Sequence, residues 1–208
     1  MKPAKTRVLL VDDHAVMRMG LVSLLSSCPE IEVIGDVGNG REGLELALRL
    51  RPDVVIMDLL MLGMDGTETT RRLCAQWPEA KVLVLTTLGT SDGFARAFEA
   101  GALGAILKTA DLDDLRQAIA EVAKGGRYVS EEIEQILSED PPVPELSLRQ
   151  REMLESVTRG LSNPEIAKLL GISLPMVKEH MNALFTKIGA ANRTEAVAIA
   201  LRKHLLRI

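Results

Sequence analysis

Five short apolar runs, each separated from the next by a stretch with helical spacing, constrain the fold of the first half of the chain most strongly. The runs read RVLLV, EVIGDV, DVVIM, KVLVLT and LGAIL. Because they are rich in Val, Ile and Leu with little polar alternation, they fit strands that are covered on both faces. Between them, apolar residues recur at i, i+3 and i+4, which indicates helices. The sequence therefore predicts five βα units in an α/β fold with a doubly wound, five-stranded parallel sheet.

Polar side chains stand at the carboxyl ends of four of these runs. Asp12 and Asp13 follow the first run, Asp58 follows the third, Thr86 ends the fourth and Lys108 follows the fifth. In an open parallel sheet these ends converge on the crevice where ligands bind. Carboxylates brought together there repel one another, and a divalent cation relieves the repulsion. Oxygen ligands beside a phosphoryl group favour Mg²⁺, so we expect a magnesium site.

The same side chains suit phosphoryl transfer to a carboxylate. A lysine and Mg²⁺ neutralise the phosphoryl oxygens while the carboxylate attacks in line. Asp58, alone at its strand end, is the expected nucleophile. The alternative is that these residues are solvated strand ends, which is common for any one of them. Four ends that suit one chemistry favour the phosphoryl site.

A proline-rich stretch divides the chain. The segment LSEDPPVPE has three prolines, so it cannot continue a helix or bury much surface. We expect a first domain over residues 1–125, a linker over 126–145 and a second domain over 146–208. Residues 1–148 carry 15 basic and 24 acidic residues, a net charge of minus 9, whereas residues 149–208 carry 10 and 5, a net charge of plus 5. The first part suits a cation and the second a polyanion.

The second part has a purely helical pattern that is interrupted by a tight turn. In LSNPEIAKLLGIS, Ser162 and Glu165 have the spacing of a capping box, Gly171 ends the helix and Ser173 caps the next one. The apolar residues of that next helix form one stripe, which is the expected core face. They are Val177, Met181, Leu184, Phe185 and Ile188.

The opposite face of this helix is polar. It presents Glu179, Asn182 and Thr186, with Lys178 on its flank. Short polar groups and a lysine in a positively charged domain suit the major groove of double-stranded DNA. The alternative is an ordinary solvated amphipathic helix, and periodicity alone does not decide between the two.

The motifs of the first part resemble the receiver domain of bacterial response regulators. VLLVDDH, DVVIMDLLMLGMDG, VLVLTT and GALGAILK carry the resemblance, in this order, across about residues 5–125. The resemblance implies a flavodoxin-like fold in which Asp12, Asp13 and Asp58 hold Mg²⁺. It also implies that the backbone carbonyl of Leu60 completes the metal shell.

By the same resemblance, Asp58 accepts a phosphoryl group from a sensor histidine kinase, and Thr86 and Lys108 bind the phosphoryl oxygens. No turnover of an external substrate is expected. An alternative from another class is a Mg²⁺-dependent phosphohydrolase built on an aspartyl-phosphate sheet. Such enzymes usually have a second aspartate two residues after the nucleophile, where this chain has Leu60.

The chain departs from the receiver pattern at two positions. The family usually has proline where Leu62 stands, and Tyr or Phe where Ala105 stands. In the family that ring moves inward as the hydroxyl at the position of Thr86 moves toward the phosphate. Because Ala105 has no ring, a regulator of the same family that responds weakly or not at all to phosphorylation stays an alternative.

The second part resembles the four-helix LuxR-type helix-turn-helix domain across about residues 146–205. GLSNPEIA, VKEH and NRTEAV are the best-matched pieces, and the whole chain resembles a response regulator of the NarL/FixJ type. The resemblance makes residues 173–187 the recognition helix and implies control of transcription by an active homodimer. The DNA-contacting residues that it implies are Lys178, Glu179, Asn182 and Thr186, and Arg193 as either a phosphate contact or a contact that stabilises the fold.

The sequence also bears on location. It reaches the first apolar run within seven residues without the apolar region of a signal peptide. No apolar stretch approaches the ~20 residues that span a bilayer. We therefore expect a cytoplasmic protein that has no membrane partner.

Overall fold

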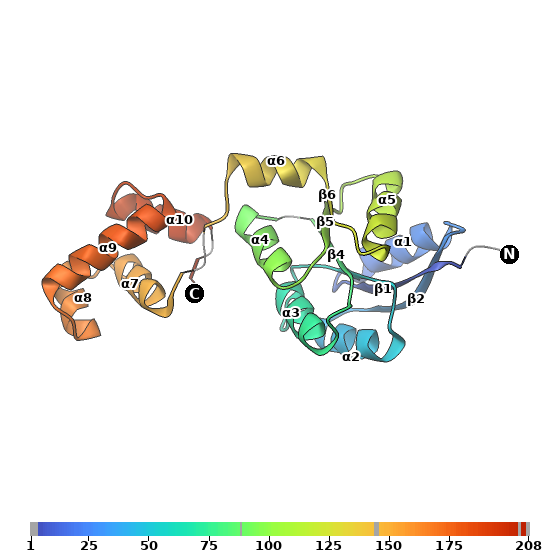
Figure 1. Cartoon of the computed structure of the whole chain (residues 1–208), viewed down its shortest axis with the longest axis horizontal. Helices are drawn as coiled ribbons and strands as arrows, with labels where there is room; N and C mark the ends of the chain where they lie inside the picture. Colours follow the sequence, from blue (N-terminus) through green and yellow to red (C-terminus); the bar gives the residue numbers. More distant parts are fainter. Residues whose placement is uncertain (1–3, 88, 144–145, 204, 207–208) are drawn as a thin grey trace. The chain divides into compact units, whose positions relative to one another are not determined.

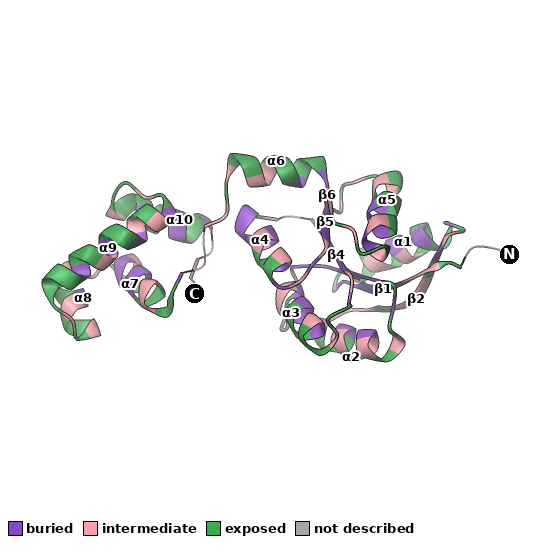
Figure 2. Ribbon diagram, viewed as in Figure 1, coloured by how far each residue is buried: buried purple, intermediate pink, exposed green. Residues whose placement is uncertain are grey.

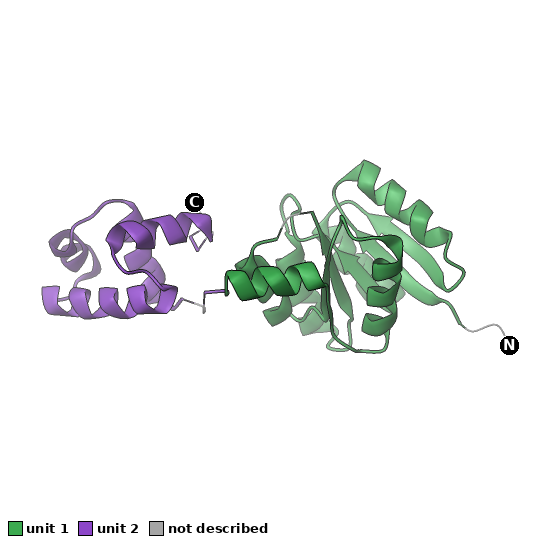
Figure 3. Cartoon of the chain, turned by 90° about the horizontal axis from the view of Figure 1, so that it is seen from above, with its two compact units in different colours: residues 1–141 green, residues 142–208 purple. Residues whose placement is uncertain are grey.

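The computed structural model of the 208-residue chain describes residues 4–87, 89–143, 146–203 and 205–206. The chain divides into two compact units, Met1–Pro141 and Pro142–Ile208, which Figure 3 shows in green and purple. Each unit has hydrophobic clusters of its own.

Unit 1 is built on a parallel sheet with the strand order β2-β1-β3-β4-β5-β6 (Figure 1). The strands are β1 Thr6–Val11, β2 Ile31–Val37, β3 Val54–Met57, β4 Val82–Thr86, β5 Gly104–Leu107 and β6 Tyr128–Val129. β3 and β4 are buried along their whole length, as apolar runs without alternation predict. The order runs outward in both directions from the centre of the sheet, which confirms the doubly wound arrangement.

The prediction of five strands is wrong by one. The sixth strand, β6, pairs in parallel with β5, where Gly104 and Ala105 lie beside Tyr128 and Val129. A Cβ added at Gly104 would lie 2.8 Å from the Tyr128 carbonyl oxygen, so a glycine allows this close pairing. A strand of two residues carries no periodicity that a sequence pattern can detect.

The helices of unit 1 alternate with the strands. They are α1 Ala15–Ser26, α2 Gly40–Leu50, α3 Gly66–Gln76, α4 Ser91–Glu99, α5 Leu112–Ala123 and α6 Glu131–Glu139. Four of them begin where a side chain accepts a hydrogen bond from a free backbone N–H of the first turn. These capping residues are Asn39, Asp65, Thr90 and Asp111.

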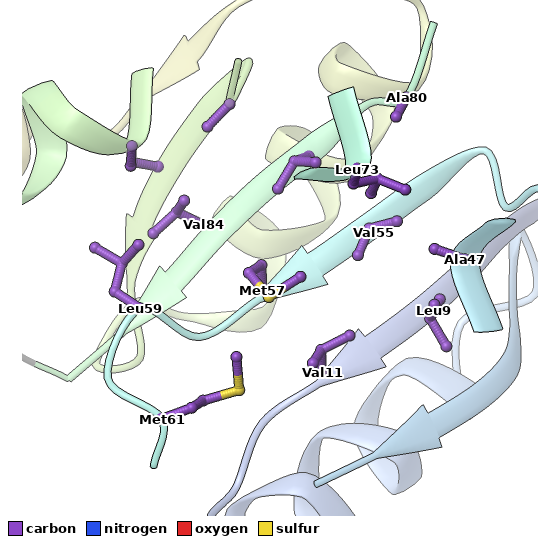
Figure 4. Close-up of a cluster of buried hydrophobic side chains, with 14 of the residues drawn as sticks. Leu9, Val11, Ala47, Val55, Met57, Leu59, Met61, Leu73, Ala80 and Val84 are labelled. Atoms are coloured by element: carbon purple, nitrogen blue, oxygen red, sulfur yellow. The ribbon is translucent and has the colours of Figure 1, made fainter. Parts of the chain in front are cut away.

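The two faces of the sheet bury different clusters because successive side chains of a strand point to opposite sides. Val8 and Leu10 of β1 belong to the cluster that α1 and α5 cover. Leu9 and Val11 belong to the cluster on the other face (Figure 4), which we call the α4-side cluster because α4, together with α2, α3 and α6, covers it. Figure 2 shows the strands buried between these helices.

The region from 126 to 145, expected as a linker, contains β6 and α6 instead. Ile133 of α6 is fully buried in the α4-side cluster, and Ile136 and Leu137 pack against it. Their i, i+3, i+4 spacing is the ordinary signal of a helix that packs on a core. Unit 1 ends only at Pro141, inside the proline-rich stretch, of which Pro144 and Glu145 lie outside the described residues.

Unit 2 is helical in its described part. Its helices are α7 Leu148–Thr158, α8 Asn163–Leu170, α9 Leu174–Ile188 and α10 Arg193–Arg202. Ser162 and Glu165 form the predicted capping box at α8, and Gly171 ends that helix in the left-handed conformation with φ 64°. Ser173 accepts a hydrogen bond from Met176 N at the start of α9. These features confirm the all-α helix-turn-helix fold.

The predicted apolar stripe of α9 is the core of unit 2. Val177, Met181, Leu184 and Ile188 are buried, whereas Phe185 is partly buried against the same cluster. Ile166 of α8 and Met153 of α7 complete its centre. Burial of one stripe leaves the polar face of α9 exposed.

Candidate functional site

Three charged side chains meet at the carboxyl edge of the sheet in unit 1. Lys108 Nζ lies 2.6 Å from Asp12 Oδ2 and 2.7 Å from Asp58 Oδ2. Each of the three side chains is at most 3 % exposed. They follow β1, β3 and β5. In the sheet β1 is the neighbour of β3, and only β4 separates β3 from β5, so the parallel topology brings the three side chains together as expected.

The ammonium of Lys108 is held in its charged form. Burial alone would lower the pKa of Lys108, because it removes water from a charge. Hydrogen bonds and charge attraction from Asp12 and Asp58 outweigh that effect and raise the pKa of Lys108 above its usual value. The lysine therefore balances part of the negative charge at the site.

Asp13 lies at the open side of this group. Its Oδ2 accepts a hydrogen bond from the backbone N–H of Leu62 at 3.1 Å, and its Oδ1 lies 3.2 Å from His14 Nδ1. Oxygens of Asp12, Asp13 and Asp58 lie, with a ring nitrogen of His14, within 4.8 Å of one another. The Asp13 Oδ1 atom is buried and accepts no hydrogen bond from the described residues.

This donor set fits a hard divalent cation. Carboxylate oxygens are the ligands that Mg²⁺ prefers, and the cluster includes a buried oxygen that lacks a donor. The fit requires no rearrangement of the strands, since all three aspartates already stand at one edge.

Thr86 and Leu60 are the remaining residues that the sequence predicted for this site. Thr86 is fully buried at the end of β4, and its carbonyl accepts a hydrogen bond from the backbone N–H of Lys108 at 2.8 Å. The backbone N–H of Leu60 donates to Asp58 Oδ1 at 3.2 Å, while the Leu60 side chain is exposed. A Cβ added at Gly66 would clash with the Asp58 carbonyl oxygen, so the glycine lets the start of α3 close over the loop.

One residue at the site was not found from the sequence. Arg18 of α1 donates from Nη1 to the Asp12 carbonyl oxygen at 2.6 Å and pairs through Nε with Asp36 of β2 at 3.0 Å. The guanidinium thus ties the backbone at Asp12 to the neighbouring strand. The available signal was a lone arginine within the apolar stretch AVMRMGLVSLL.

The predicted DNA-contacting residues of unit 2 fall into two groups. Lys178, Glu179, Asn182 and Thr186 are exposed on one side of α9. Arg193, at the start of α10, is only partly exposed, and its Nη2 donates to the carbonyl oxygens of Val157 and Leu161. The sequence left two roles open for Arg193, and these contacts favour stabilisation of the fold.

The two units define the class of protein. Unit 1 is a parallel α/β domain with acids and a lysine at its carboxyl edge, and unit 2 is a helix-turn-helix domain. No helix in the described part of the chain combines the length and the apolar character needed to cross a membrane.

Comparison with known proteins supports this class. Residues 8–120 match the family model of the response regulator receiver domain, and residues 144–200 match that of the bacterial regulatory proteins of the luxR family. The transcriptional regulatory protein LiaR of Bacillus subtilis is 38 % identical, with 96 % of this chain and 99 % of LiaR covered. A nitrate/nitrite response regulator protein homolog of Haemophilus influenzae is 36 % identical, with 96 % and 98 % covered.

A solved structure agrees with these matches. The response regulator ChrA of a heme-sensing two-component system is 36 % identical, with a TM-score of 0.59 over 98 % of this chain and 100 % of ChrA. The chain therefore belongs to the two-component response regulators of the NarL/FixJ type, which join a receiver domain to a LuxR-type DNA-binding domain and regulate transcription. This is a family of transcriptional regulators rather than of enzymes.

Proposed function

We propose that unit 1 accepts a phosphoryl group on Asp58 from a sensor histidine kinase, and that this modification controls DNA binding by unit 2. The observation that carries the proposal is the position of Lys108, whose ammonium lies within 2.7 Å of both Asp12 and Asp58 in a buried site. A cation at that place is suited to the oxygens of a phosphoryl group on the neighbouring carboxylate.

The proposed transfer uses the side chains at the edge of the sheet. A carboxylate oxygen of Asp58 forms the new P–O bond while the P–N bond to the kinase histidine breaks, and the electron pair leaves with the imidazole. Asp12, Asp13, Asp58 and the backbone carbonyl of Leu60 would hold Mg²⁺, which when bound neutralises phosphoryl charge.

Two further groups would bind the product. Lys108 would exchange its contact with Asp58 Oδ2 for a phosphoryl oxygen, and the Thr86 hydroxyl would bind another. In this proposal Asp58 is the acceptor of the phosphoryl group and not an intermediate on the way to another substrate. We therefore expect no turnover of an external substrate.

In unit 2 we assign DNA recognition to α9. Lys178 would contact a phosphate or a base, and Asn182, Glu179 and Thr186 would face base edges in the major groove of double-stranded DNA. One module of this size makes few base contacts, so a homodimer that reads two half-sites is the expected active form. We expect the protein to act in the cytoplasm, where DNA and the kinase domain are both available.

The alternative of weak phosphorylation control has its own structural support. Ala105 of β5 is fully buried and offers a methyl group where the family usually has an aromatic ring. The chemistry at Asp58 does not depend on that ring, whereas in the family the ring takes part in passing the change to the outer face. The two candidates therefore differ in whether phosphorylation changes the affinity for DNA.

The proposed chemistry is tested by incubation with acetyl phosphate and Mg²⁺ followed by intact-mass analysis. We expect the mass of one phosphoryl group on the wild type and none on Asp58→Asn. Asp13→Asn should need a higher Mg²⁺ concentration for the same yield, because it removes one ligand charge. A phosphoryl group that still appears on Asp58→Asn, or a yield that is independent of Mg²⁺, would contradict the assignment.

A further inference from the structure

We propose that residues 127–140, which we call the output segment, transmit the phosphorylation signal from α4 to the boundary of unit 2. The segment consists of Arg127, β6, Ser130, α6 and Asp140. This inference rests on the proposed phosphorylation of Asp58. Contacts join the output segment to α4 at its beginning, in its middle and at its end.

The first contact is a cation–π pair. The guanidinium carbon of Arg127, directly before β6, lies 4.6 Å from the centroid of the Phe98 ring on α4. A stacked arginine is attracted to the face of an aromatic ring and restricts the motion of both side chains. The start of the output segment is therefore attached to the last turn of α4.

The middle contact is hydrophobic. Ile133 of α6 is fully buried in the α4-side cluster, which also contains Phe94 and Ala97 of α4. The helix α6 contacts both α4 and β5. Movement of α4 would open space beside Ile133 and forfeit packing, because buried side chains are packed without voids.

The end contact is a hydrogen bond between two helix ends. Ser91, the first residue of α4, is buried and donates from Oγ to Asp140 Oδ2 at 3.2 Å. Asp140 follows the last residue of α6, and the next residue, Pro141, is the last of unit 1. This bond therefore links the start of α4 with the point where the chain leaves the receiver.

The start of α4 is also close in sequence to Thr86, whose hydroxyl would bind a phosphoryl oxygen. Only four residues separate Thr86 from Ser91. Among them, Gly89 lies so close to the buried ring of Phe94 that an added Cβ would clash with it. A shift of Thr86 toward a phosphoryl oxygen would therefore reach α4 over four residues, of which Gly89 packs against Phe94.

β5 offers a poorer route. Ala105 presents only a methyl group to the α4-side cluster, so no ring can change its position there. Its backbone instead supports the output segment, since Ala105 O accepts a hydrogen bond from Ser130 N at 3.2 Å. The output segment thus pairs with the edge of β5 through its backbone. Its contacts with α4 are the ones that would change when α4 moves.

In the resting protein the Ser91 to Asp140 bond holds the end of α6, and phosphorylation displaces α4 and loosens the output segment. Hydrogen–deuterium exchange of the full chain measures this directly through the amides of residues 131–140. Beryllofluoride with Mg²⁺ serves as the phosphoryl mimic, and its binding is followed independently by fluorine NMR.

We expect beryllofluoride to speed exchange of these amides in the wild type. Ser91→Ala should speed it roughly 2- to 10-fold without the mimic, which corresponds to the loss of one hydrogen bond. The matched control is Ser138→Ala, whose hydroxyl donates within α6 to Gln135 O at 2.9 Å and makes no bond to α4. This control should leave the exchange of the other α6 amides unchanged.

The outcomes separate this inference from the proposed function. If beryllofluoride binds but the α6 amides exchange as before, the output role is wrong while the phosphorylation site stands. Equal effects of Ser91→Ala and Ser138→Ala would also overturn it. If the mimic does not bind at all, the phosphorylation of Asp58 fails and the output role fails with it.

Discussion

Lys108 and Asp58 form a buried ion pair, with Nζ 2.7 Å from Oδ2. Lys108 follows β5 and Asp58 follows β3, so the pair spans the carboxyl end of β4, which lies between them. The same ammonium lies 2.6 Å from Asp12 Oδ2, so it occupies part of the space between carboxylates that also suit a metal ion. A lysine and a cation in one acidic site compete for the same negative charge.

We therefore predict opposite effects of Lys108→Met on stability and on metal affinity. Without metal, the free energy of unfolding of unit 1 should fall by about 3 kcal/mol, because two buried carboxylates lose their partner. Mg²⁺ should bind several-fold more tightly, because the competing charge is gone. Thermal melts across a Mg²⁺ titration measure both quantities.

Lys124→Met is the matched control for this experiment. Lys124 is exposed, and its Nζ lies 3.5 Å from Glu121 Oε2 on the surface. It should change neither quantity appreciably, since surface ion pairs contribute little. Weaker Mg²⁺ binding in Lys108→Met would show that the lysine supports the metal site instead of competing with it.

A ring placed at position 105 should not restore the usual receiver switch. Ala105 is fully buried in the same cluster as Ile133 of α6, so Ala105→Tyr should overpack the site and lower the free energy of unfolding by about 1–3 kcal/mol. Urea unfolding followed by the fluorescence of Trp77 in unit 1 measures this. Ala120→Tyr, at an exposed position of α5, should have little effect. Equal stability of the two variants would mean that position 105 has room for a ring.

Unit 2 should lose stability in acid through Glu165. Hydrogen bonds from the side chain and backbone of Ser162 lower the pKa of Glu165. A lowered pKa in the folded state contributes stability above the unfolded value of about 4.3, and this contribution is lost as the pH falls through the folded pKa.

Glu165→Gln should therefore reduce the acid dependence of stability. We expect its urea midpoint, from circular dichroism, to fall less than that of the wild type between about pH 6 and pH 3. Glu155→Gln changes an exposed glutamate of α7 and provides the comparison. The same pH dependence in both variants would exclude a role for the capping box.

Lys178 and Arg193 should behave differently although both are basic residues of unit 2. Lys178→Ala should weaken DNA binding and reduce the salt slope by about 1, with the unfolding midpoint unchanged. Arg193→Ala should mainly lower the free energy of unfolding, by about 1–3 kcal/mol, because the carbonyl groups of Val157 and Leu161 lose a donor. The reverse pattern would make Arg193 the phosphate contact.

The sequence predicted those parts of the fold that depend on periodicity and on helix caps. The runs ending at Val11, Met57 and Thr86 became buried strands, and Ser162 and Ser173 cap helices as expected. These features are local, so the residue pattern alone determines them.

Features that depend on contacts distant in sequence were missed. β6 pairs with β5 where Gly104 lets the Tyr128 carbonyl approach, and α6 packs on a cluster formed by residues far earlier in the chain. The ion pair of Arg18 with Asp36 likewise depends on how α1 packs beside β2. The prolines that follow α6 favoured the prediction of a linker, although Ile133, Ile136 and Leu137 have the apolar spacing of a packed helix.

The affinity for DNA with and without beryllofluoride tests the central claim most directly, when wild type and Asp58→Ala are compared at one salt concentration. A promoter fragment selected by the protein itself serves as the probe. We predict that the mimic, in the presence of Mg²⁺, raises the affinity of the wild type and leaves that of Asp58→Ala unchanged. An unchanged affinity of a wild type that has bound the mimic would contradict phosphorylation control and leave a DNA-binding regulator governed by other means.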